Sequence, residues 1–192
     1  DVLEALPFAD AFLTPSAMFG RESKPNSHRL YVSPAETKQF KYKRPGETDL
    51  TMLVELRSTG CQTVFPGSFH EGGEEIKWNK SSIAPVPIAA EELQQKVGWV
   101  AAGALLSREW PKLRGSRNPM YMALIGGLMN CGWEQAATRV FVETLATVTM
   151  DEELTDRLKI VGATYEKAKK EKKYTGWKTL AEHIGKDVVD KV

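Results

Sequence analysis

The fold is decided by residues 50–73, which read Leu50-Thr-Met-Leu-Val-Glu-Leu-Arg-Ser-Thr-Gly-Cys-Gln-Thr-Val-Phe-Pro-Gly-Ser-Phe-His-Glu-Gly-Gly73. The residues alternate from 51 to 57, which predicts a strand with Met52, Val54 and Leu56 on one wholly apolar face. The opposite face ends in Glu55 and Arg57. Because a protein core does not need a carboxylate beside a guanidinium, we expect this face to present charge to a ligand.

The second half of this stretch predicts another strand and an exposed loop. A turn at 58–60 precedes the apolar run 61–65, which we interpret as a strand. The loop at 66–70 then places the hydroxyl of Ser68 and the imidazole of His70 on a glycine-rich backbone. Both side chains are candidates for lining a binding pocket, although a plain loop explains His70 equally well.

Composition and charge narrow the class of protein. The chain has 192 residues, of which 42% are hydrophobic and 27% charged, with a formal net charge of +1. Any contact with nucleic acid must therefore come from local basic patches. Cys61 and Cys131 lie in apolar segments without a histidine at ligand spacing, which predicts buried free thiols and a reducing, cytoplasmic setting.

The first residue and the hydropathy of the chain predict a fragment of a longer protein without a membrane span. The chain opens with Asp1 rather than methionine, so we expect a piece of a longer protein. No signal-like opening and no apolar run near ~18 residues is present, and we therefore expect neither export nor a membrane span.

On either side of the opening stretch, the pattern predicts short elements around a cationic loop. A helix over 4–13, a strand over 29–32, a polar strand over 36–43 and a short strand over 74–78 fit the sequence. The segment 19–28 is rich in Gly, Pro, Asn and Ser and is interpreted as a loop. It gathers Arg21, Lys24, His28 and the adjoining Arg29, as a triphosphate would require, but a solvated loop also fits.

The second half of the chain is predicted to be helical. A segment rich in proline and serine at 81–88 is interpreted as a linker between a domain at 1–80 and another at 89–192. Apolar periodicity predicts helices over 89–110, 118–131, 133–149, 151–169 and 177–184. The expected fold is α+β, with a mostly antiparallel sheet followed by an all-α helical bundle.

Several motifs follow one another in a recognisable order. They are an acid at Asp1, Asn26-Ser-His28, the acid Glu55, and the loop Phe65-Pro-Gly-Ser-Phe-His70 followed by Trp78. This order resembles the primase-polymerase domains of the archaeo-eukaryotic primase superfamily, as found in phage and plasmid replication proteins. The resemblance implies that residues 1–80 are a truncated primase-type core, and landmarks such as Gly132-Trp133 resemble the helical domain that joins such cores to a helicase.

The chain departs from the family pattern at three points. The partner acid expected before Asp1 is absent, the second motif reads Asn-Ser-His instead of Ser-x-His, and the third acid is Glu55 rather than the commoner Asp. We therefore expect the parent protein, but not this fragment alone, to synthesise primers.

The resemblance implies two-metal nucleotidyl transfer. Mg²⁺ or Mn²⁺ would be held by Asp1 and Glu55, because carboxylates are the hard oxygen ligands that such ions prefer. Catalytic roles would fall to Asp1, Glu55 and His28. Nucleotide contacts would come from Arg21, Lys24, Ser27, His28, Arg57, Ser68 and His70. The implied partners are a single-stranded DNA template, nucleoside triphosphates and a replicative helicase domain in the same or another chain, in the cytoplasm of a bacterial host.

A lysine-rich run offers a second surface. Lys167, Lys169, Lys170, Lys172 and Lys173 either contact template phosphates or form the solvated end of a helix, which the helix dipole favours. Two rival functions also remain open at this point: a non-catalytic replication module that binds template and docks a helicase, and a metal-dependent nuclease that uses the same acids.

Overall fold

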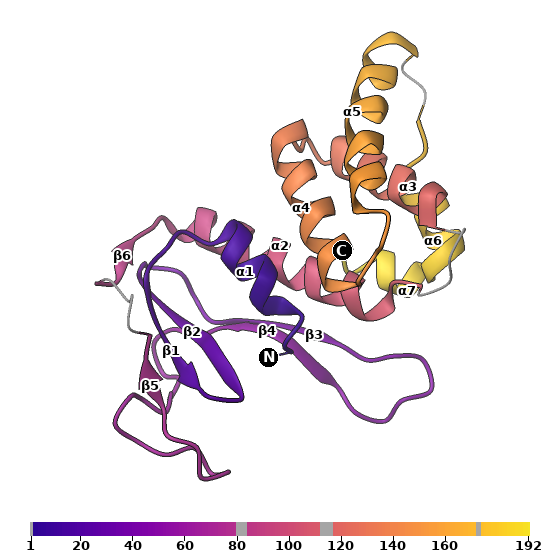
Figure 1. Ribbon diagram of the computed structural model, residues 1–192. Coiled ribbons are helices and arrows are strands. Elements are labelled where there is room, and N and C mark those ends of the chain that lie inside the picture. The colour runs from indigo at the N-terminus through magenta and orange to yellow at the C-terminus, as the bar shows by residue number, and fades with distance from the viewer. Residues whose placement is uncertain (1, 80–83, 112–116, 172–173) are drawn as a thin grey trace. The chain divides into compact units, whose positions relative to one another are not determined.

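The computed structural model describes residues 2–79, 84–111, 117–171 and 174–192 (Figure 1). The chain divides into two compact units, Asp1–Ala101 and Ala102–Val192. Strands occur in the first unit and the second is helical, so the predicted α+β class is confirmed. The division falls inside helix α2 (Ala90–Glu109), later than the linker that we predicted at 81–88.

The described residues of the first unit form two sheets that are almost wholly antiparallel. The larger sheet has the strand order β5-β1-β2-β6, and only β2 and β6 run parallel to each other. Strands β3 and β4 form a separate antiparallel pair. The strands are β1 (Ala17–Arg21), β2 (Lys24–Val32), β3 (Lys38–Tyr42), β4 (Thr51–Leu56), β5 (Lys77–Trp78) and β6 (Val86–Pro87).

The segment predicted as a loop at 19–28 belongs instead to the β1–β2 hairpin. Phe19 faces His28 across the two strands, and Ala17 faces Leu30. The register shifts between Phe19 and Arg21, and a Cβ at Gly20 would lie only 2.4 Å from the carbonyl oxygen of Lys24. The turn-forming composition at 20–27 therefore accommodates a bulge inside a hairpin.

The first part of α2 completes the core of this unit, which explains the late boundary. Leu93 and Val97 of α2 form a buried cluster with Ala35, and Val54 and Leu56 of β4 pack against it. The apolar face predicted for the strand at 51–57 thus finds its cover on the helix. Helix α1 (Ala5–Phe12) buries Phe8 completely.

The strand predicted at 61–65 is wrong, because the described residues there form an irregular loop. Arg57 Nη1 donates a hydrogen bond to the Gln62 carbonyl at 3.0 Å, and Phe65 packs on the buried ring of Phe19. Local side-chain contacts thus replace strand pairing. The expectation of buried thiols is also wrong, since Cys61 in this loop and Cys131 after α3 are both exposed.

The second unit is built around the apolar helix α3 (Arg117–Asn130), whose Leu124 and Ile125 are fully buried. The other helices are α4 (Gln135–Val148), α5 (Leu154–Glu171), α6 (Trp177–Ile184) and α7 (Lys186–Val189). Two glycines of α3 allow the start of α6 and the residues just before it to approach α3 closely. A Cβ at Gly126 would lie 1.7 Å from the Thr175 carbonyl oxygen, and one at Gly127 would lie 2.5 Å from the ring of Trp177, the first residue of α6. Figure 1 shows α4 and α5 side by side, as their contacts require.

A buried ionic network ties α3 to α5 in this unit. Arg157 is 1% exposed, and its guanidinium contacts Asp151, with Nε at 2.9 Å from Oδ2. Arg117 Nη1 approaches the other oxygen of the same carboxylate at 3.4 Å. Asp151 therefore bridges two largely buried arginines, which also pair with Glu152 and Glu153 respectively. Within the described parts of the chain, no helix has the length and apolarity needed to cross a bilayer.

Candidate functional site

A cleft of about 530 Å³ opens in the first unit. Its walls come from the β1–β2 hairpin, the end of β4 and the loop that follows β4. The residues that line it are Arg21, Lys24, Ser27, His28, Arg29, Leu30, Glu55, Leu56, Arg57, Thr63, Val64, Phe65, His70 and Ile76. Segments distant in sequence thus converge on one cavity.

The lining of the cleft is rich in cationic side chains. It carries Arg21, Lys24, Arg29 and Arg57 with one carboxylate among the described lining residues, that of Glu55, and the acids Glu74 and Asp10 pair with Arg21 and Arg29 from outside the lining. Positive charge concentrated in a concave surface attracts polyanions. The folded chain therefore supplies the local basic patch that the sequence as a whole lacks.

The arginines are held in place by acidic partners. Arg21 Nε lies 3.5 Å from Glu74, and Arg29 is paired with Asp10 of α1. Glu74 also accepts hydrogen bonds from Ser23, from its backbone N–H at 2.7 Å and from its hydroxyl at 2.6 Å, and so ties the loop to the hairpin turn. These contacts preorganise the guanidinium groups before any ligand binds.

Glu55 of β4 lines the cleft together with residues of the β1–β2 hairpin. Its carboxylate accepts hydrogen bonds from Gln39 Nε2 and from Arg57 Nε, both at 2.6 Å. The hydrogen bond from Gln39 is the largest cause of its lowered pKa, and the Arg57 guanidinium lowers the pKa further. Glu55 is thus a stable anion at neutral pH, but its charge is already engaged by Arg57.

His28 lies in a half-buried position on the floor of the cleft. Its ring stacks on that of Phe19, with the centroids 4.6 Å apart and the planes 8° from parallel, and its Nδ1 lies 3.1 Å from Ser27 Oγ. Burial lowers the pKa of His28, and the positive charges of Arg57, Lys24 and Arg21 lower it further. At neutral pH the imidazole is therefore uncharged, and a bound anion would favour its protonation.

This environment predicts a ligand-dependent shift in the titration of His28. The pKa of His28 in the folded protein lies below the ordinary value of 6.5. Between these two pKa values the unfolded state binds the proton more readily than the folded state, so the stability of the fold decreases as the pH drops through 6.5. Inorganic tripolyphosphate in the cleft should raise the pKa of His28. NMR titration of the imidazole signals, assigned with His28→Asn, measures the midpoint without interference from ionisation of the phosphate itself. A midpoint at or above 6.5 in the free protein would contradict this account.

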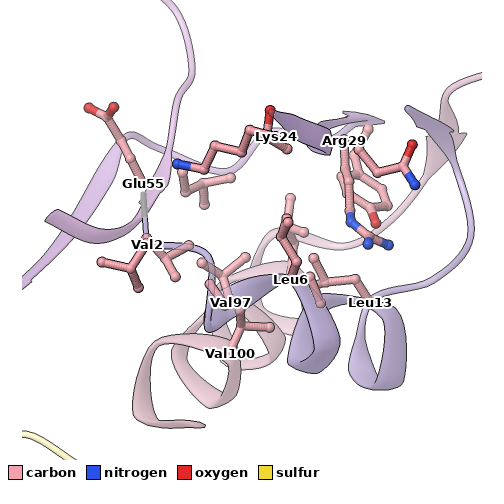
Figure 2. A pocket seen from close by; sticks show the side chains of 16 residues that line it. Val2, Leu6, Leu13, Lys24, Arg29, Glu55, Val97 and Val100 are labelled. Atoms are coloured by element: carbon pink, nitrogen blue, oxygen red, sulfur yellow. The ribbon is translucent and has the colours of Figure 1, made fainter. Parts of the chain in front are cut away.

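A smaller pocket of about 100 Å³ shares part of the cleft's lining (Figure 2). Lys24, Arg29 and Glu55 lie on one side of it, and apolar side chains from α1 and α2 such as Leu6 and Val97 lie on the other. Its walls are mainly apolar. The polar cleft thus borders the packed core directly, which holds its strands in a fixed position.

Most of the predicted nucleotide-binding residues lie together in the cleft. Ser68 is the exception, since it is exposed and does not belong to the lining. His70 does line the cleft, and its Nδ1 accepts a hydrogen bond from the Gly72 N–H at 3.1 Å, so it also stabilises its own turn.

Some predicted residues fall elsewhere. Asp1, Lys172 and Lys173 lie outside the described residues. Lys167 and Lys169 of α5 pair with acids of the same helix, Glu171 at 3.7 Å and Glu166 at 2.9 Å. A role of Lys167, Lys169 and Lys170 in DNA binding stays a prediction.

The described residues do not by themselves fit a two-metal site. Glu55 is the only carboxylate among the described residues that line the cleft, and no group of three or more His, Cys, Asp or Glu side chains suited to a metal occurs in the described part of the chain. Two divalent ions need more oxygen ligands than one carboxylate provides. We therefore assign Glu55 the roles that its contacts support, namely orienting Arg57 and balancing its charge.

Three functional positions were missed from the sequence. Gln39 holds Glu55, Glu74 holds Arg21, and Phe65 lines the cleft. The register of β3 and β4 pairs Gln39 directly with Glu55, so matching the two alternating strands would have revealed the first of them. Glu74 depends on a loop contact across a long sequence separation, for which the sequence gives no signal.

Comparisons of the chain with protein-family models, curated proteins and solved structures give no match. The resemblance to primase-polymerases therefore stays a prediction from motifs, and the geometry of the cleft carries the functional argument.

Proposed function

We propose that the cationic cleft binds a nucleoside triphosphate and that the chain is part of a primase-polymerase that makes and extends primers on single-stranded DNA. One observation carries the proposal: six of the seven residues that the sequence predicts to contact a nucleotide line the same cleft as Glu55, and Ser68 is the exception. The six are Arg21, Lys24, Ser27, His28, Arg57 and His70. Independent segments gathering in this way are what a binding site requires.

The chemistry of the lining suits a polyphosphate. Arginine presents paired N–H donors that match phosphate oxygens, and lysine adds a point charge. A neutral His28 beside the Ser27 hydroxyl offers hydrogen-bonding groups that a phosphate can use, and the imidazole can become cationic once an anion is bound. The triphosphate would also have to compete with Glu55 for Arg57, which makes binding sensitive to that carboxylate.

Metal dependence belongs to the proposal through the family resemblance. If a divalent ion accompanies the triphosphate, Glu55 is the residue of the described cleft that can contact it, and the ion would supply charge neutralisation at the phosphates. In that case Glu55→Gln weakens nucleotide binding in the presence of Mg²⁺. Without the metal the same change tightens binding, because it frees Arg57 from its carboxylate partner.

Arg57→Gln is expected to weaken ATP binding by about 10- to 150-fold, since charge-assisted hydrogen bonds contribute about 1.5–3 kcal/mol. Isothermal titration calorimetry with ATP measures the change. Arg139→Gln, at an exposed position of α4 in the other unit, is the matched control and should bind like the wild type. Equal affinities for the Arg57 and Arg139 variants would show that the cleft is not the phosphate site.

The rival functions are separated by a product assay. Protein is incubated with single-stranded template, labelled nucleotides and Mn²⁺ or Mg²⁺. Longer products support the primase-polymerase, degraded template supports the nuclease, and template binding without either reaction supports the replication module that docks a helicase.

A further inference from the structure

Two exposed aromatic rings, Phe65 and Trp78, pack on each other and on the buried ring of Phe19. Phe65 and Trp78 are each 46% exposed, whereas Phe19 beneath them is fully buried. The ring centroid of Phe65 lies 5.0 Å from that of Phe19 and 5.4 Å from that of Trp78. Phe65 also lines the cleft, so part of its apolar ring is presented to whatever binds there.

The backbone around these rings is well fixed. Phe19 faces His28 on one neighbouring strand and Trp78 on the other, which puts the three rings on the same face of the sheet. After Phe65, the Gly67 N–H donates to the Ile76 carbonyl at 3.2 Å, and the Ile76 N–H donates to the Ser68 carbonyl at 2.9 Å. The Phe65 ring is therefore a supported surface with little conformational entropy left to lose on binding.

A flat apolar ring beside a cationic cleft is a combination that suits a nucleotide, which carries both a base and phosphates. Proteins that bind nucleotides or single strands combine basic side chains for the phosphates with aromatic side chains on which bases stack. Here Arg21, Lys24 and Arg57 provide the charges, and Phe65 provides the ring in the same cavity. Exposing two aromatic rings in water has no benefit for folding, which favours a binding role.

We propose that Phe65 is the stacking platform for a nucleobase whose phosphates lie against Arg21, Lys24 and Arg57, with Phe19 and Trp78 as positioning residues. This inference rests on the proposed function of the cleft. Every base has a π-face, so the platform distinguishes nucleotides from phosphate alone and discriminates little between bases. The base belongs either to a free nucleotide or to a DNA strand, and the experiment separates the two.

The test compares ligands with and without a base. Affinities for ATP, inorganic tripolyphosphate and a single-stranded oligothymidylate are measured by calorimetry for the wild type, Phe65→Ala, Phe65→Tyr and Phe69→Ala. Phe69 is an exposed aromatic residue of the same loop, 69% exposed and outside the cleft lining, and so provides a matched control. Thermal melts check that each variant is folded.

We expect Phe65→Ala to weaken ATP binding by about 5- to 150-fold while leaving tripolyphosphate binding unchanged. Phe65→Tyr should bind ATP with nearly the wild-type affinity because it retains the ring. Phe69→Ala should bind ATP like the wild type. If Phe65→Ala weakens binding of the oligothymidylate but not of ATP, Phe65 stacks on a base of the DNA strand. This outcome also supports the stacking platform and identifies the strand as the source of the base.

Two outcomes overturn the inference, and they differ in what they say of the cleft. If ATP and tripolyphosphate bind the wild type but Phe65→Ala alters neither ATP nor oligothymidylate binding, the stacking platform is wrong and the phosphate site stands. If the wild type binds none of the three ligands, the proposed function fails and the platform fails with it.

Discussion

Replacing Asp151 with alanine is expected to lower the free energy of unfolding of the helical unit by about 3–5 kcal/mol, because it removes the buried carboxylate that Arg117 and Arg157 share. The remaining acidic partners, Glu152 and Glu153, are 41% and 53% exposed and neutralise the buried arginines less effectively. The Asp151 side chain is completely buried between Arg157 and Arg117, whose side chains are 2% and 7% exposed. Burial alone would raise the pKa of Asp151, but hydrogen bonds from Arg157 and from the Glu153 N–H, together with both guanidinium charges, hold it below 3.8. The carboxylate is therefore ionised in the folded protein.

The matched control is Asp156→Ala. Asp156 pairs with Lys159 at 2.8 Å on the surface of α5, where such pairs contribute about 0–1 kcal/mol. Urea unfolding followed by far-UV circular dichroism gives both values. Since the folded-state pKa of Asp151 is lowered, its contribution is fully present above 3.8 and is lost as the pH falls below that value. Equal destabilisation by the two variants would show that the buried network contributes no more than a surface pair.

The helical half was well predicted because its signal is local. The segments predicted at 118–131 and 133–149 coincide with α3 and α4 to within a few residues. The first is a nearly continuous apolar run that is buried on all sides, and the second has apolar residues at helical spacing that bury one face. The β1–β2 hairpin was missed because its composition favours turns, and the partner strand that stabilises it can be recognised only once the pairing of Phe19 with His28 is known. Tertiary pairing outweighed local propensity there.

The residues of the candidate site also differ in whether local sequence or tertiary contacts reveal them. Residue types with a direct chemical meaning, such as His28 and Arg57, line one cleft, and their functional role stays a prediction. Supporting residues such as Gln39 act through contacts that the sequence does not reveal. Ser68 was expected in the cleft from its place in the loop, but Phe65 and His70 of this loop line the cleft and Ser68 does not. Loop geometry depends on hydrogen bonds across the chain, which motif order cannot supply.

Phe19→Ala is expected to cost about 3–5 kcal/mol of stability, the usual penalty for removing a fully buried phenylalanine ring. Its functional effect should exceed that of an equally destabilising change elsewhere. Phe19 contacts His28 by stacking and Phe65 and Trp78 by tilted and edge-on packing, so a cavity at position 19 removes the support of these three rings. The imidazole of His28 should become more hydrated, and its pKa should rise toward 6.5 as the burial that lowers it is relieved.

Phe8→Ala is the control for this prediction. Phe8 is also fully buried but belongs to α1 and lies outside the cleft lining, so its loss should cost similar stability while leaving the titration of His28 unchanged. Urea unfolding and NMR titration of His28 are measured on both variants, and Phe19→Leu should give a smaller change in each. The two readouts are independent because unfolding reports the total loss of packing, whereas the pKa of His28 reports only the ring stacked against Phe19. If Phe8→Ala and Phe19→Ala shift the His28 titration equally, the imidazole senses the general loosening of the unit, and the aromatic floor has no specific role in setting the chemistry of the cleft.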